Sequence, residues 1–119
     1  MKIVKRLVLS VVLIFSAYPV YAAVDCLGTV TLLSLSLNGS GTVTLSLSGG
    51  PSATYLCDID GAGRNGVSPK VCQAMYGTLM AAKTTSKKVS IRFYNYDSCA
   101  AIPGWANSGE LGWTVLLTD

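Results

Sequence analysis

The feature that most constrains the fold of this chain is a change of side-chain parity in the segment GTVTLLSLSLNGSGTVTLSLSGG, which runs from Gly28 to Gly50. Apolar residues fall on even positions up to Leu32 and on odd positions from Leu33 onward. Because neighbouring side chains of a strand face opposite sides, the buried face would switch at this point. A β-bulge between Leu32 and Leu33 would restore it and bend the strand. The segment therefore predicts a long, bent first strand.

A return strand follows a turn at residues 38–41, whose Asn and Gly residues tolerate positive φ. Its apolar face holds Val43, Leu45 and Leu47, and Gly49-Gly50-Pro51 ends it. Both strands carry Ser and Thr on their polar faces and no charge. Without charged side chains, an exposed edge of this hairpin would be poorly protected against pairing with another chain. An interaction surface at this hairpin is therefore an open alternative.

The rest of the chain predicts three further strands and one helix. We expect strands at about 53–59, with Tyr55, Cys57 and Ile59 alternating, at 89–97 and at 111–117, with a loop over 98–110. Ser68-Pro69 is typical of a helix start. The helix continues to about residue 83 on an apolar face that comprises Val71, Cys72, Met75, Tyr76, Leu79 and Ala82. Within it, Gly77 either weakens the helix or permits close packing.

The resulting order, β-β-β-α-β-β, is that of a small five-stranded OB-like barrel, mainly β with one helix. In such a barrel the first strand pairs with the fourth in antiparallel fashion, so that Cys26 would lie near Cys99. Cys57 and Cys72 would then join the third strand to the helix. The barrel therefore predicts two disulfides, Cys26–Cys99 and Cys57–Cys72. We favour disulfides over a zinc site because the chain has neither histidine nor a CxxC pair.

The N-terminus predicts export. Lys2, Lys5 and Arg6 precede an apolar run, and Val20-Tyr21-Ala22 is typical of a cleavage site, so residues 1–22 read as a signal peptide and 23–119 as one domain. An uncleaved anchor is the less favoured alternative. Removal of three of the nine basic residues leaves six against six acidic residues. The domain is then formally neutral, which argues against nucleic-acid binding. We expect a secreted or periplasmic protein without a membrane segment after cleavage.

Two motifs in the 58–66 loop are weak. Gly61-Ala62-Gly63-Arg64-Asn65-Gly66 matches GxGxxG, but no parallel βαβ unit follows, so a loop is the favoured interpretation. Asp58 and Asp60 offer carboxylates to calcium, yet Ala62 and Pro69 occupy places where an EF-hand has further ligands. Two solvated loop carboxylates are the favoured interpretation, with a weak calcium site left open. No cofactor and no metal are predicted.

Composition also argues against catalysis. The chain has no histidine, which excludes Ser-His and Cys-His nucleophiles, and Glu110 is its single glutamate. Asp97 and Glu110 could form a carboxylate pair, but no pattern supports it. We therefore expect that the protein is not an enzyme.

The candidate ligand-binding residues are Arg92, Tyr94, Tyr96 and Trp105. The first three lie opposite the core face of the fourth predicted strand, with Asn95 and Asp97 nearby. Aromatic rings beside planar hydrogen-bonding groups suit sugars, whose C–H faces stack while their hydroxyls need partners. The alternative, which we weigh equally, is that Tyr94 and Tyr96 pack beneath the following loop.

The segment Tyr55-Leu56-Cys57 … Cys72 … Lys88-Val89-Ser90-Ile91-Arg92-Phe93 resembles the B subunits of subtilase-cytotoxin-type toxins. The resemblance covers about residues 55–96 and implies an exported OB fold with a disulfide ahead of the helix. It also implies a glycan-binding ring oligomer. No binding residue is transferred, because the first hairpin has no match to that family's contact region.

Together these observations predict an exported, non-catalytic binding module for a glycan or a protein partner. The family resemblance adds the expectation that it assembles into a ring homo-oligomer. The alternative is a structural or interaction protein of the periplasm or cell surface, such as an inhibitor or matrix component, with no small ligand.

Overall fold

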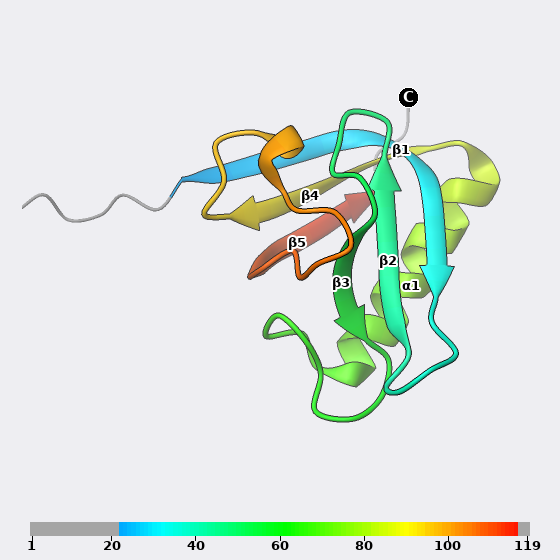
Figure 1. Ribbon diagram of the computed structural model, residues 1–119. Coiled ribbons are helices and arrows are strands. Elements are labelled where there is room, and N and C mark those ends of the chain that lie inside the picture. The colour runs from blue at the N-terminus through cyan, green and yellow to red at the C-terminus, as the bar shows by residue number, and fades with distance from the viewer. Residues whose placement is uncertain (1–21, 117–119) are drawn as a thin grey trace, which may run out of the picture.

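A computed structural model describes residues 22–116 and contains five strands, one α-helix and one short 3₁₀ helix in that range. The predicted order is confirmed (Figure 1). The elements are β1 (Ala23–Leu35), β2 (Thr42–Leu47), β3 (Thr54–Asp58), α1 (Pro69–Thr85), β4 (Lys88–Tyr94), η1 (Cys99–Ala101) and β5 (Leu111–Leu116).

The five strands form one antiparallel sheet in the order β3-β2-β1-β4-β5, curled into a half-barrel (Figure 1). The sheet does not close by a full ladder. In the described chain, β3 meets the segment before β5 only at a parallel bridge between Tyr55 and Asn107. There the Tyr55 N–H donates to Ala106 and the Ser108 N–H donates to Tyr55. The closed barrel that the sequence suggested is thus only partly closed.

Strand β1 is long and bent, as predicted, because it serves two neighbours. Its first half pairs with β4 from Ala23 to Thr29, and its second half pairs with β2 from Val30 to Leu35. The predicted bulge is present, but it lies between Val30 and Leu32, one residue earlier than expected. Beyond it the inward side chains change from even to odd positions, and Leu33 and Leu35 pack against the core.

The expected alternation in the third strand is wrong. Leu56 and Cys57 are both fully buried, and Tyr55 is half-buried. The register between β2 and β3 shifts because Val43 faces Cys57 while Thr44 faces Tyr55, which leaves Leu56 as an extra residue. A bulge therefore lets two neighbouring residues contribute to the core.

Helix α1 begins where the sequence predicts. The Ser68 hydroxyl accepts a hydrogen bond from the Val71 N–H at 3.3 Å, Pro69 occupies the first turn, and Ser86 ends the helix in a left-handed conformation. Cys72, Leu79 and Ala82 are buried against the sheet. Val71, in the first turn of the helix, is exposed, contrary to the predicted apolar face. A Cβ at Gly77 would meet open space, so close packing is not its role.

Both predicted disulfides are present. Cys26 of β1 bonds Cys99 at the start of η1, and Cys57 of β3 bonds Cys72 of α1. The first joins β1 to the segment that follows its partner strand β4, and the second joins the helix to the sheet. All four cysteines are thereby used.

Strand β4 ends at Tyr94, three residues before the predicted end, because Asn95 adopts a left-handed conformation with φ 70°. The predicted face of the last strand is outside the described side chains from Trp113 onward, and Leu117 is outside the described residues. The signal peptide predicted over residues 1–22 likewise falls almost wholly outside them. Among the described residues, no helix is both long and apolar enough to cross a membrane.

The two disulfides should stabilise the fold unequally. Their sequence separations are 73 and 15 residues. In the chain-entropy model the longer loop contributes about 4.5 kcal/mol and the shorter about 3 kcal/mol. The Cys26→Ala/Cys99→Ala variant should therefore lose more free energy of unfolding than Cys57→Ala/Cys72→Ala, as measured by urea denaturation of oxidised protein. A larger loss in the second variant would contradict this account of the loops.

Candidate functional site on the outer face of β1 and β4

An ion pair between Asp25 and Arg92 is the best-organised polar feature of the outer face. The two residues are direct cross-strand partners on β1 and β4, and both side chains point away from the core because their neighbours Cys26 and Ile91 are buried. The Arg92 Nε donates to one carboxylate oxygen of Asp25 at 2.8 Å and its Nη2 donates to the other at 3.0 Å. This fork geometry fixes the plane of the guanidinium.

The pair remains accessible to solvent, since 40 % of the Arg92 side chain and 53 % of the Asp25 side chain are exposed. The hydrogen bond from Arg92 lowers the pKa of the Asp25 carboxyl, and the same bond raises the pKa of Arg92. Both groups are therefore charged at neutral pH. On β5, Gly112 lies against the aliphatic stem of Arg92, with a hypothetical Cβ at 2.8 Å from the Arg92 Cβ. A larger residue there would displace the arginine.

The structure separates the two tyrosines that the sequence grouped together. Tyr94 lies on β4 two residues from Arg92, on the same face, and its cross-strand partner is the small Ala23. Asn95 then turns the chain, and Tyr96 packs against the hydrophobic core. Its hydroxyl lies 3.6 Å from the position that a Cβ of Gly109 would occupy. Tyr96 thus packs beside the loop, as in the alternative interpretation, whereas Tyr94 stays with Arg92.

Trp105 lies in the loop between η1 and β5, and its backbone is bonded to the segment before β3. Its backbone N–H donates to the Ala53 carbonyl at 2.7 Å, and its φ is 53°. Its side chain is 70 % exposed. Among the described residues, no hydrogen bond or ion pair joins it to Arg92 or Tyr94. The described contacts therefore do not join Trp105 to Arg92 and Tyr94, with which the sequence grouped it.

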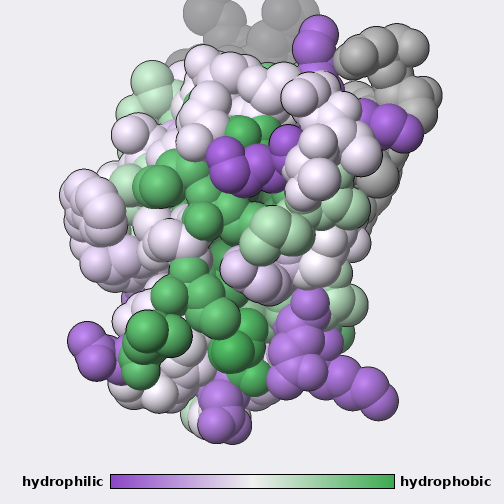
Figure 2. Space-filling view, turned by 90° about the vertical axis from the view of Figure 1, so that its right-hand side faces the viewer, coloured by the Kyte–Doolittle hydropathy of each residue, from purple (hydrophilic) through white to green (hydrophobic). Residues whose placement is uncertain are grey.

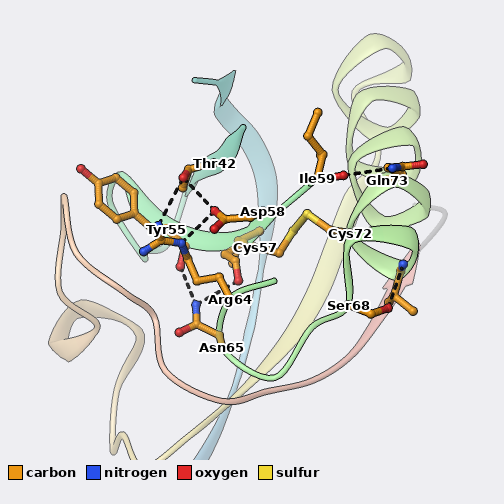
Figure 3. Close-up of a disulfide and its surroundings, with 12 residues drawn as sticks. Thr42, Tyr55, Cys57, Asp58, Ile59, Arg64, Asn65, Ser68, Cys72 and Gln73 are labelled. Carbon is orange, nitrogen blue, oxygen red and sulfur yellow. Dashed lines mark hydrogen bonds and ion pairs between the residues drawn. A yellow bond between two sulfur atoms is a disulfide. The ribbon is translucent and has the colours of Figure 1, made fainter. Parts of the chain in front are cut away.

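The glycine-rich loop between β3 and α1 has a structural role that sequence reasoning missed. Arg64 reaches back to β3, where its Nε donates to Asp58 at 2.9 Å and its guanidinium lies 5.6 Å from the centre of the Tyr55 ring (Figure 3). It also donates to the Asn107 side chain and, at 3.4 Å, to the Thr42 hydroxyl. One side chain thereby ties together β2, β3 and the segment before β5.

Asn65, the next residue, covers the outer edge of β3. Its side-chain amide donates to the Tyr55 and Leu56 carbonyls, both at 2.9 Å, and to the Ser108 hydroxyl at 3.1 Å (Figure 3). These bonds occupy carbonyls that an edge strand would otherwise offer to another chain. A single Asn-Gly pair after a glycine-rich stretch was the only sequence signal for this residue.

The arrangement of the two loop aspartates does not favour a calcium site. The Asp58 carboxylate is buried and accepts hydrogen bonds from Arg64 and from the Thr42 hydroxyl at 2.8 Å. Asp60 is exposed, and its carboxylate accepts from the Gly61 N–H. Within residues 22–116 there is no group of three or more His, Cys, Asp or Glu residues that could hold a metal ion.

A search with protein-family models, a search of curated proteins and a search of solved structures each find no match to this chain.

The ion pair of Asp58 should make stability depend on pH. Burial raises the pKa of this carboxyl, but the hydrogen bonds from Arg64 and Thr42 outweigh burial, so its pKa lies below the ordinary value of about 3.9. The stabilisation is then fully present above that value and is lost as the pH falls toward the folded-state pKa. Wild type should be more stable than Asp58→Asn at pH 6, and the difference should shrink below about pH 4.

Chemical denaturation at several pH values measures this difference. In an Arg64→Ala background the effect of Asp58→Asn should depend much less on pH, because the main charged partner is gone. A wild-type advantage that stays constant from pH 7 to pH 3 would contradict the role given to the ion pair.

Proposed function

We propose that the protein is an exported, non-catalytic binding module that recognises a glycan or a protein partner through the outer face of β1 and β4. The observation that carries this proposal is the exposed Arg92 guanidinium, held flat by Asp25 and flanked by Tyr94. Stability alone gives little reason for such a pair, because exposed ion pairs contribute only about 0–1 kcal/mol. A preorganised arginine beside an aromatic ring is instead suited to recognition.

The chemistry of this face fits a sugar. An arginine has five N–H donors. Asp25 engages the Nε and Nη2 groups, which leaves donors on Nη1 for a ligand hydroxyl. The ring of Tyr94 offers an apolar face to sugar C–H groups, and Ala23 opposite it leaves room for a ligand to approach. Both oxygens of Asp25 retain lone pairs, so donors and acceptors lie side by side.

The alternative, an interaction protein without a small ligand, is favoured by Trp105. A tryptophan that is 70 % exposed on a backbone fixed to Ala53 resembles the rigid aromatic anchors that dominate protein interfaces. Among the described residues Trp105 shares no hydrogen bond or ion pair with Arg92, so substitution of each residue tests one of the two candidate functions.

Export is supported by the two disulfides, which are consistent with an oxidising compartment. The non-catalytic assignment is supported by the composition, since the chain lacks histidine and has one glutamate.

A glycan array probed with oxidised protein tests the proposal. We expect Arg92→Ala and Tyr94→Ala to reduce binding at least tenfold, because each removes one component of the preorganised face. Trp105→Ala is the matched aromatic control and should bind the same glycans as wild type.

Circular dichroism and the unfolding midpoint must show that each variant is folded. Loss of glycan binding in Trp105→Ala, with binding retained in the other two variants, would move the site to the loop. If no glycan binds to the wild-type protein, the glycan form of the proposal is wrong. Binding that survives both Arg92→Ala and Tyr94→Ala would overturn the assignment to this face.

A further inference from the structure

The second half of β1 has one unpaired edge. The ladder with β4 ends at the pair Thr29 and Lys88, and from Val30 to Leu35 the strand pairs only with β2. Within residues 22–116, no other strand pairs with this edge. Residues before Lys88 cannot continue the ladder, because the N–H groups of Ser86 and Lys87 are bonded back to the end of α1.

The backbone groups of this edge alternate in a defined way. The Ser36 N–H donates to the Thr42 carbonyl at 2.9 Å, so Ser36 faces β2. Bonds of an antiparallel ladder involve every second residue, and Ser34, which lies opposite Thr44, faces β2 as well. The N–H and C=O groups of Leu33 and Leu35 therefore point away from β2, toward the open edge.

The strand that forms this edge is uncharged and partly apolar, and the charged Asp60 lines the same surface pocket as Leu35 and Leu37. No charged residue occurs between Gly28 and Gly50. Leu37, just beyond the strand, is 96 % exposed, and Leu32, Leu33 and Leu35 are each half-buried. Figure 2 views the side on which β1 and α1 lie and shows apolar atoms gathered in a band. By contrast, Asn65 and the segment at Asn107 already occupy the edge of β3.

We propose that two copies of this chain pair in antiparallel fashion through this edge of β1, about a two-fold axis at Ser34. In this register Leu33 of one copy lies opposite Leu35 of the other, and each donates to and accepts from its partner. The exposed Leu37 comes beside Thr31 of the second copy. The pairing would join the two half-barrels into one continuous sheet. Because Leu33 and Leu35 face the core side, their side chains would bring the apolar interiors of the two copies together.

A second copy is the occupant that the observations favour. The register about Ser34 makes the edge self-complementary, because the residues with open backbone groups, Leu33 and Leu35, face each other in both copies. Without the predicted signal the chain carries six basic and six acidic residues, so two copies do not repel each other through net charge. A two-fold contact closes after two subunits, and the predicted assembly is a dimer in place of the ring that the family resemblance implies.

Engineered cysteines test the register directly. Ser34 is exposed, and at a non-hydrogen-bonded pair on the axis the two Cα atoms would lie about 4.5 Å apart, within reach of a disulfide. Ser34→Cys should form a covalent dimer on non-reducing gels. Ser36→Cys is the matched control, because its two copies would lie about 13 Å apart and should not cross-link.

Charge at the same position tests the interface without a new covalent bond. Wild-type protein with both native disulfides should show a monomer–dimer equilibrium at micromolar concentration by sedimentation velocity, as expected for a small interface. Ser34→Lys would place two ammonium groups together on the axis and should weaken dimerisation at least tenfold. Ser52→Lys, an exposed position outside the edge, should dimerise as wild type does.

The proposal would be overturned by a wild-type protein that stays monomeric at concentrations up to about 100-fold above the micromolar range. Cross-linking of Ser36→Cys in preference to Ser34→Cys would also overturn it. A larger oligomer that Ser34→Lys leaves intact would also overturn it. The glycan proposal concerns the outer face of β1 and β4 and is tested with a glycan array. Its success or failure therefore does not affect this test of dimerisation.

Discussion

The structure depends on one strand that serves two partners. The first half of β1 bonds β4 and its second half bonds β2, and the bulge between Val30 and Leu32 turns the strand between them. This turn allows a single sheet to wrap around its own apolar side chains, with α1 covering part of the inner face. The Cys26–Cys99 bond fixes the start of this strand, and the Cys57–Cys72 bond fixes the helix. In a domain this small, such covalent links supplement a limited core.

The two proposed surfaces follow from this geometry. Where β1 pairs with β4, its outward side chains are available, and there Asp25 holds Arg92 beside Tyr94. Where β1 pairs with β2 instead, the backbone groups of Leu33 and Leu35 are available as well, and residues 28–50 carry no charge. The opposite edge of the sheet differs because Arg64 and Asn65 secure it from within the chain.

Features that depend on local pattern could be predicted from the sequence. These include the parity change in β1, the Ser68-Pro69 helix start and, once the strand order was inferred, both disulfides. Features set by contacts between distant segments could not. The bulge at Leu56 places two neighbours in the core against alternation, and Asn95 directs Tyr96 inward although it follows Tyr94 by two residues. Likewise, Trp105 is fixed by a bond to Ala53, which no local pattern indicates.

The fold depends on an exchange of partners along β1, which pairs with β4 up to Thr29 and with β2 alone beyond it. Amide hydrogen exchange measured by NMR on dilute, monomeric protein tests this claim residue by residue. The N–H groups of Ser34 and Ser36 should exchange slowly because they bond to β2, whereas those of Leu33 and Leu35 should exchange quickly. Equal protection of all four amides in the monomer would contradict the account, since it would mean that another segment of the same chain closes this edge.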